Sequence, residues 1–418
     1  MTRADPYLAP PPTRGSWAAV VGIALGAFAL VVTEFLPVGL LPDMTREFGV
    51  SEGTAGLAIT ATALLGAIAA PLTTIVIGRL DRRTVLLSLT GLLVVAGAIS
   101  AFAQHFAVLI AGRVLLGVAV GGFWAVSLAA AARLVPHDRV HTASSLVLGG
   151  ISVGAVVSVP AASFISAHYD WRIAYGAATA LAVVVFLIQL VLLPRIPMHR
   201  AVVAGHFRQL LAMPKVRAIL LTVVLIVGGH YAGYTFVTPY LEQLTGLQTN
   251  SLSILLLVYG VVTVVGTFIG GVLAARHRHR AVLITTGVFL LSMTIVAAFA
   301  HDAVVTTPAV LAWALAIGMA PVCTQLWLYA NTTRFVEAAQ AMNTGVFQLS
   351  IALGSLLGAV TVDLISLHSS MWLGAAALAL AALVVLVVGR VAPDNEDERQ
   401  HDTEASSPAA AREPARSA

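Results

Sequence analysis

The sequence predicts an all-α polytopic membrane protein in which twelve transmembrane helices form two six-helix bundles. Of its 418 residues, 59% are hydrophobic and only 10% are charged, whereas soluble domains average about 25% charged residues. Uncharged runs of about 20 residues, long enough to cross a hydrocarbon layer ~30 Å thick, recur along the whole chain. The last six runs repeat features of the first six, which indicates two related halves.

The twelve runs are placed from the gaps between charged residues. The first is too long for the core of a cleaved signal peptide, so it is expected to remain as a helix. The single cysteine, Cys323, excludes an internal disulfide and a metal site built from clustered cysteines. The expected spans lie near residues 17–41, 55–77, 84–104, 106–132, 143–167 and 173–193, and then near 217–241, 252–275, 281–300, 304–329, 341–366 and 371–389.

Lysine and arginine are unevenly distributed between the predicted loops. If the amino terminus is cytoplasmic, 20 of the 23 basic residues lie in cytoplasmic segments, Arg46 and Arg172 lie in outside loops, and Arg113 lies within a span. Cytoplasmic loops of membrane proteins are enriched in basic residues. We therefore expect both termini in the cytoplasm, and this topology explains the net charge of +4 without nucleic-acid binding.

A basic segment separates two halves that resemble each other weakly. Each half has a basic loop after its second span, "RLDRR" and "RHRHR", and a proline near the outer end of its first span, Pro37 and Pro239, where a bend is expected. Internal repeats with a solute site between the halves are typical of transporters. The expected organisation is an amino-terminal tail (1–16), a first bundle (17–193), a cytoplasmic linker (194–216), a second bundle (217–389) and a disordered tail (390–418).

Few ionisable side chains lie inside the predicted spans, where each costs about 2.5–3.5 kcal/mol. Glu34 and Arg113 both lie roughly 10 Å below the outer ends of their spans, and Asp363 lies nearer an outer end. We expect Glu34 and Arg113 to pair as a proton-coupling site, because a paired carboxylate stays ionised and one separated in an apolar pocket takes up a proton. In the structural alternative, Arg113 caps a neighbouring helix or reaches the membrane surface, and Glu34 bonds to backbone that Pro37 leaves free.

The seventh span contains "GGHYAGYTFVTPY", in which His230 and Tyr234 share a helix face near the middle of the membrane and Thr238 follows one turn later. Rings that bear hydrogen-bond donors can stack on a flat ligand and bond to its edge. Stacking contributes about 1–3 kcal/mol per base in nucleic-acid sites. His230 and Tyr234 are therefore candidate substrate-binding residues, with interhelical packing as the competing interpretation.

Two further candidates for substrate binding lie in other spans. Trp124 follows Arg113 by three helical turns and lies deeper toward the cytoplasm, and Gln348 lies on a polar stripe of span 11 with Thr344 and Ser355. Small and amide residues also join helices in lipid, so packing is the competing interpretation here too.

Several stretches resemble the major facilitator superfamily, in particular its twelve-span drug:proton antiporter branch: "DRRTVLL", "AGRVLLGVAVGGFW" and "YDWRIAY". Within that branch, "TEFLPVGLLP", "GRVLLGVAVGGFWAVS" and "GHYAGYTFVTPYLEQ" are similar to bacterial purine ribonucleoside exporters, and related sugar exporters share the first. The resemblance covers about residues 15–390. It implies a central cavity lined by spans 1, 4, 7 and 10. It also implies that Arg113 is the span 4 motif arginine and that Asp81, Arg82 and Arg83 belong to the loop motif that latches the outward-facing state.

The expected function is export of a small polar solute, most specifically a purine nucleoside or analogue, driven by inward proton flow through Glu34. The resemblance implies a location in the bacterial cytoplasmic membrane and no cofactor beyond the proton gradient. A multidrug or sugar exporter on the same fold is the alternative, and a non-transporting sensor is less favoured. An enzyme is not expected, because Glu34 and His230 have no partner carboxylate or histidine at their depth. The expected partners are the solute, protons and the lipid bilayer, and the expected state is a monomer.

Overall fold

The computed structural model describes residues 14–76, 80–136, 139–196, 205–332 and 336–391. Within these ranges all regular secondary structure is helical. The predicted terminal tails, 1–16 and 390–418, lie almost entirely outside the described residues, as does part of the predicted linker.

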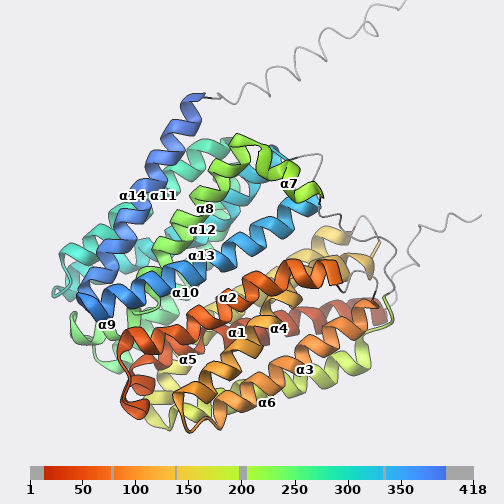
Figure 1. Ribbon diagram of the computed structural model, residues 1–418, viewed down its shortest axis with the longest axis horizontal. Coiled ribbons are helices and arrows are strands. Elements are labelled where there is room, and N and C mark those ends of the chain that lie inside the picture. Colours follow the sequence, from red (N-terminus) through yellow and green to blue (C-terminus); the bar gives the residue numbers. More distant parts are fainter. Residues whose placement is uncertain (1–13, 77–79, 137–138, 197–204, 333–335, 392–418) are drawn as a thin grey trace, which may run out of the picture.

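The described chain forms two bundles, drawn in red to yellow and in green to blue in Figure 1. Twelve of its helices are long and apolar enough to cross a membrane. They match the twelve predicted spans to within a few residues at most ends, so the predicted fold is confirmed. The N-terminal half contains α1 (Arg14–Phe48), α2 (Glu52–Val76), α3 (Arg82–Ala101), α4 (Phe106–Arg133), α5 (Val140–His168) and α6 (Trp171–Leu192).

The C-terminal half repeats this arrangement with one helix divided in two. A short helix that the sequence did not predict, α7 (Gly205–Ala212), lies in the linker. The half contains α8 (Pro214–Tyr234), α9 (Val237–Gln243), α10 (Thr249–Arg276), α11 (Arg278–Ala298), α12 (Ala303–Ala330), α13 (Val336–Leu364) and α14 (Leu367–Val391).

The first helix is longer than the sequence predicts. It continues through Pro37 and Pro42 to Phe48, seven residues beyond the predicted end. Glu34 therefore lies 14 residues from the end of its helix rather than seven, and closer to the middle of the membrane. Pro37 has no N–H, so it leaves the carbonyl oxygen of Thr33 without its usual helical donor.

The corresponding helix of the second half is broken. α8 ends at Tyr234, and α9 starts at Val237. Between them the backbone of Phe236 leaves the helical conformation, and its N–H bonds to the carbonyl oxygen of Gly233. Pro239 cannot donate to the carbonyl oxygen of Thr235, one turn earlier, which explains why the break lies here. At Pro239, where a bend is expected, the structure interrupts the helix for two residues.

The two halves meet along α2 with α13 and along α5 with α10. Figure 1 shows α2 and α13 side by side along this interface. Described hydrogen bonds join the halves at the end that carries the α1–α2 connection, which we call the sealed end, and at the middle of the interface. They join Ser51 and Gly53 to Asp363, Gln243 to Glu52, Thr238 to Val38, Ser355 to Gly56 and Gln348 to Glu34.

Candidate functional site

Arg113 is wholly buried and directs its guanidinium at the backbone of two neighbouring helices. Nη1 donates to the carbonyl oxygen of Thr33 at 2.8 Å, and Nη2 donates to that of Glu34 at 2.6 Å. Nε donates to the carbonyl oxygen of Ala58 on α2 at 3.0 Å. Because Pro37 leaves the Thr33 carbonyl without its helical donor, Arg113 replaces a missing backbone hydrogen bond in a buried region.

The expected ion pair between Glu34 and Arg113 is not formed. Among the described residues, no ion pair joins the Glu34 carboxylate to any basic side chain. The two residues do lie at the same depth, as the sequence predicts, but they meet through the Glu34 backbone. The geometry is that of the structural alternative for Arg113, in which the arginine caps a neighbouring helix.

The Glu34 side chain lies at the interface between the halves and is only 5% exposed. Its Oε1 accepts a hydrogen bond of 3.3 Å from Nε2 of Gln348 on α13, which belongs to the other half. Gly66 on α2 leaves room for this amide, because a Cβ at that position would lie 2.8 Å from Nε2. Gln348, expected to bind substrate, is thus the described partner of the candidate proton-coupling carboxylate. We call Glu34, Arg113 and Gln348 the charged site.

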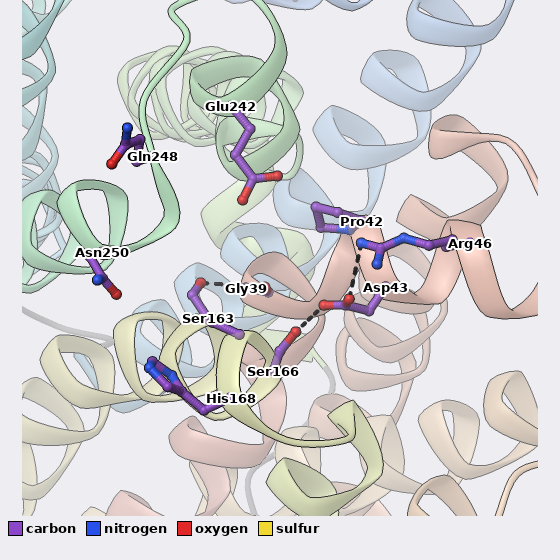
Figure 2. A pocket seen from close by; sticks show the side chains of 11 residues that line it. Gly39, Pro42, Asp43, Arg46, Ser163, Ser166, His168, Glu242, Gln248 and Asn250 are labelled. Atoms are coloured by element: carbon purple, nitrogen blue, oxygen red, sulfur yellow. Dashed lines mark hydrogen bonds and ion pairs between the residues drawn. The ribbon is translucent and has the colours of Figure 1, made fainter.

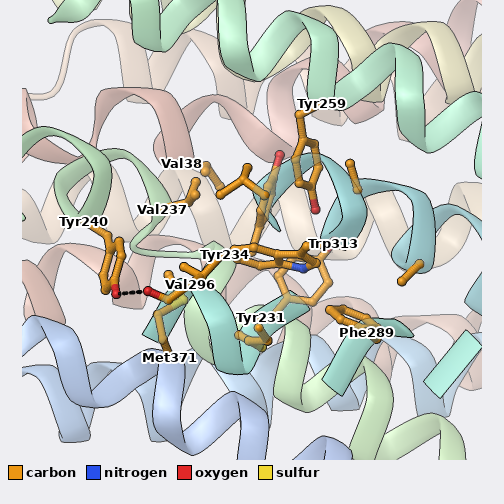
Figure 3. Packing of buried hydrophobic residues seen from close by; sticks show 14 of the residues in the cluster. Val38, Tyr231, Tyr234, Val237, Tyr240, Tyr259, Phe289, Val296, Trp313 and Met371 are labelled. Atoms are coloured by element: carbon orange, nitrogen blue, oxygen red, sulfur yellow. Dashed lines mark hydrogen bonds between the residues drawn. The ribbon is translucent and has the colours of Figure 1, made fainter. Parts of the chain in front are cut away.

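His230 lies at the centre of a group of buried rings from four helices of the C-terminal half. Its ring stacks on Tyr234 with centroids 4.7 Å apart, and Tyr234 stacks on Tyr259 at 5.4 Å. Figure 3 shows most of these rings converging between the helices. We call the group the aromatic cluster: His230, Tyr231 and Tyr234 of α8, Tyr259 of α10, Phe289 of α11 and Trp313 of α12.

Several polar atoms of the aromatic cluster have no described partner. Nδ1 of His230 accepts a hydrogen bond of 2.9 Å from Nε1 of Trp313. The hydroxyl of Tyr259 is buried without a hydrogen-bond partner in the described part of the chain. No hydrogen bond is described for Nε2 of His230 or for the hydroxyls of Tyr231 and Tyr234. Buried polar groups nearly always have a partner. The cluster therefore combines closely stacked rings with hydrogen-bonding capacity that its described neighbours do not use.

The charged site and the aromatic cluster are joined by one ring contact. Phe35, which follows Glu34 on α1, stacks on Tyr231 with centroids 6.1 Å apart and planes inclined by 14°. This contact places α1, next to Glu34, against a wall of the aromatic cluster.

The family can be assigned at this point. The family model described as Major Facilitator Superfamily matches residues 23–336 and again residues 220–417. The chain belongs to the major facilitator superfamily.

The chain is also similar to individual members of the superfamily. It is 32% identical over 373 residues to the purine ribonucleoside efflux pump NepI of Escherichia coli O6:K15:H31 (strain 536 / UPEC), and the match covers 89% of this chain and 94% of that protein. The NepI protein of E. coli strain K12 is 30% identical over the same coverage.

Solved structures share the fold at low sequence identity. A bacterial homologue of the human lysosomal transporter Spinster, in an inward-facing and unoccupied conformation, has a TM-score of 0.76 at 15% identity, covering 90% of this chain and 98% of that one. A D-xylose–proton symporter has a TM-score of 0.71 at 18% identity, covering 88% and 97%.

The loop-motif residues of the superfamily lie within the N-terminal half. The carboxylate of Asp81 caps α3 by accepting from the backbone N–H of Arg83 at 2.8 Å. Nη2 of Arg83 donates to the carbonyl oxygen of Leu190 at 2.9 Å. The backbone N–H of Arg82 donates to the carbonyl oxygen of Ile196 at 3.0 Å, and its side chain is buried. Their role as a latch remains a prediction.

The other candidates are separated from the aromatic cluster. Trp124 is half-buried and packs against the core of the N-terminal half. Thr344 bonds to its own helix at Gln340. Ser355 and Thr238 instead form hydrogen bonds between the halves toward the sealed end.

A polar cavity of about 480 Å³ lies at the sealed end between the two halves (Figure 2). Asp43 accepts hydrogen bonds from Ser166 and from Arg46 there. Burial raises the pKa of Glu242 above its ordinary value, and the neighbouring Asp43 raises it further. The lining comes from both halves and includes Gly39, Asp43, Arg46, Ser163, Ser166 and His168 on one side and Glu242, Gln248 and Asn250 on the other.

Sequence reasoning missed Tyr231, Tyr259, Phe289, Trp313 and Phe35. Aromatic residues in an apolar helix resemble ordinary packing residues, which is why periodicity did not separate them. A signal was present nevertheless, because the N–H of tryptophan and the hydroxyl of tyrosine require a partner in hydrocarbon. Tyr259 and Trp313 lie well inside their spans, far from the aqueous interface that would supply one.

Proposed function

We propose that this transporter is a proton-coupled exporter of small polar solutes, most specifically purine nucleosides or their analogues. The observation that carries the proposal is the buried Glu34 carboxylate, held at the interface of the halves by an uncharged donor from the opposite half. The Arg113 guanidinium lies near but is bonded to backbone carbonyl oxygens, and an ionised carboxylate that is not directly paired is costly in a low-dielectric interior. Glu34 therefore holds a proton in this arrangement, which is open to the cytoplasm, and releases it to the cytoplasm when the solute binds.

The arrangement of hydrogen bonds between the halves supports alternating access. The sealed end is held by hydrogen bonds such as those of Asp363 with Ser51 and Gly53. From the distribution of basic residues, we assign the sealed end to the outside, so that this conformation opens toward the cytoplasm. Opening of the sealed end separates Gln348 from Glu34, and this links the proton site to the direction in which the solute site faces.

The aromatic cluster is the proposed solute site. Rings such as His230 and Tyr234, which stack on each other here, would stack on a base that enters between them, and the unpartnered hydroxyl of Tyr259 would bond to its edge. The relatives named purine ribonucleoside efflux pumps support the choice of purine nucleosides. A proton that crosses 100 mV provides about 2.3 kcal/mol, which sustains a solute gradient of tens of fold.

Proteoliposomes with radiolabelled inosine and an imposed pH gradient test this proposal. The unchanged protein should accumulate inosine against its gradient. Glu34→Gln should abolish the accumulation and leave inosine binding measurable, whereas Glu47→Gln, which changes an exposed acid on the same helix, should behave like the unchanged protein. Undiminished gradient-driven accumulation by Glu34→Gln would overturn the proton-coupling role of this residue.

The same fold also supports sugar and drug exporters. Growth of cells with and without the gene, in toxic purine analogues and in antibiotics, separates these alternatives. Protection against the purine analogues alone is the expected result.

A further inference from the structure

The hydrogen bond between Trp313 and His230 determines where the imidazole carries its proton. Trp313 is wholly buried on α12, and its Nε1 lies 2.9 Å from Nδ1 of His230 on α8. An indole N–H can only donate a hydrogen bond. Nδ1 is therefore the acceptor and has no proton, so the single proton of the neutral ring is on Nε2.

This tautomer determines how the opposite edge of the imidazole, at Nε2, forms hydrogen bonds. Nε2–H can only donate, and no acceptor for it is described in the chain. The neighbouring hydroxyls of Tyr231, Tyr234 and Tyr259 can either donate or accept. The aromatic cluster thus combines one fixed donor with three groups that adapt to the bound molecule.

We infer that Trp313 is a positioning residue that holds His230 as an obligate hydrogen-bond donor, so that the aromatic cluster selects planar solutes with an acceptor on the ring edge. The inference rests on the proposed function, which places the solute at this cluster. It also separates the two tasks of the transporter, because His230 cannot take a second proton while Nδ1 accepts from Trp313. The transported proton is left to Glu34.

Packing alone is the competing explanation for Trp313. The indole ring contacts His230, Tyr234, Tyr259 and Phe289. Trp313→Phe keeps an aromatic ring there and removes the N–H. Trp327→Phe is the matched control, because Trp327 is equally buried on the same helix and packs in a different part of the half, against His279.

The variant His230→Gln distinguishes a positioning role of Trp313 from a role in packing alone. The glutamine amide N–H₂ can reach the place of Nε2 and donates whatever Trp313 does. In the unchanged background, Trp313→Phe should weaken inosine binding by about tenfold, the loss of one buried hydrogen bond. In the His230→Gln background, the same substitution should have little further effect, because the donor no longer depends on the tautomer.

The experiment measures inosine binding to the purified full-length protein for the two single variants, the double variant and Trp327→Phe, with thermal unfolding as the check on folding. NMR spectra of protein with isotope-labelled histidine report the tautomer directly. The histidine signal that is missing from the His230→Gln spectrum belongs to His230. In the unchanged protein this signal should show an unprotonated Nδ1, and in Trp313→Phe it should show a mixture of the two tautomers.

Equal weakening by Trp313→Phe in both backgrounds, or no weakening in either, would overturn the inference while leaving the proposed function intact. A protonated Nδ1 in the unchanged protein would do the same. Failure of the unchanged protein to bind inosine would instead overturn the proposed solute, and with it the role assigned to His230.

Discussion

The charged site and the aromatic cluster use opposite means to place polar groups inside a membrane. In the N-terminal half, Arg113 satisfies its donors with backbone carbonyls, and its partner Glu34 is held by a single amide. In the C-terminal half, His230 and three tyrosines are enclosed by rings and keep several polar atoms without partners. The difference indicates that one half is organised to hold a proton and the other to hold a solute.

Two consecutive residues of α1 make contacts across the interface between the halves, one within the charged site and one to the aromatic cluster. Gln348 reaches from the C-terminal half to Glu34, and Phe35 reaches from the N-terminal half to Tyr231. Because Glu34 and Phe35 are consecutive residues, a movement of α1 changes both contacts together. This adjacency provides a short physical route for coupling between proton and solute.

The largest expected effect follows from removal of the guanidinium that organises the charged site. Arg113→Lys keeps the positive charge but cannot bond to the three carbonyl oxygens of Thr33, Glu34 and Ala58. We expect a loss of roughly 3 kcal/mol in the free energy of unfolding, measured as a lower melting temperature and a lower folded yield. Arg172→Lys, at a partly exposed ion pair with Glu47, is the control and should change stability by less than about 1 kcal/mol. Full stability of Arg113→Lys would contradict the capping role.

A smaller effect is expected at the sealed end, where Asp363 joins the halves. Asp363→Ala removes the acceptor for the Ser51 hydroxyl and the Gly53 N–H. The expected cost is about 1–2 kcal/mol, which increases opening of this end by about tenfold. The rate at which a polar thiol reagent modifies Ser163→Cys in the cavity measures the opening.

Two features of the chain simplify this measurement. Cys323 is buried, so the introduced cysteine is the reactive one. Asp302→Ala is the matched control, because Asp302 accepts from the backbone N–H groups of Val304 and Val305 within one half. Equal labelling rates in the two variants would show that Asp363 does not hold the halves together.

The smallest expected effect concerns the ring contact between the two sites. Phe35→Leu removes the stacking of Phe35 on Tyr231, worth about 1 kcal/mol. We expect the dependence of inosine affinity on pH to weaken, while affinity at any one pH changes little. Phe289→Leu should instead lower inosine affinity and leave its dependence on pH unchanged, because the described ring contacts of Phe289 are with His230 and Trp313 of the aromatic cluster. The same loss of pH dependence in both variants would remove Phe35 from the coupling route.

Much of the fold and part of the site could be predicted from sequence. Apolar length sets the spans because lipid requires every backbone group to be satisfied within a helix, and the cost of burying charge marked Glu34 and Arg113. The hydrogen-bond partners of Arg113 could not be predicted from span length or from the cost of buried charge, because they depend on which carbonyls of α1 lie opposite α4. Pro37 was the signal that the Thr33 carbonyl needed a donor.

The aromatic cluster shows a second limit of sequence reasoning. His230 and Tyr234 could be recognised because they share a helix face, whereas Tyr259 and Trp313 come from other helices and meet them only after packing. The inter-half bond of Asp363 has the same origin, since its partners Ser51 and Gly53 lie more than 300 residues away.

Proton release on solute binding tests the central claim most directly. If Glu34 holds the proton and the aromatic cluster holds the solute, linkage requires that inosine binding to the transporter releases protons. In weakly buffered solution, the unchanged protein should release protons when it binds inosine, and Glu34→Gln should bind inosine without release. Equal proton release from both proteins would contradict the account.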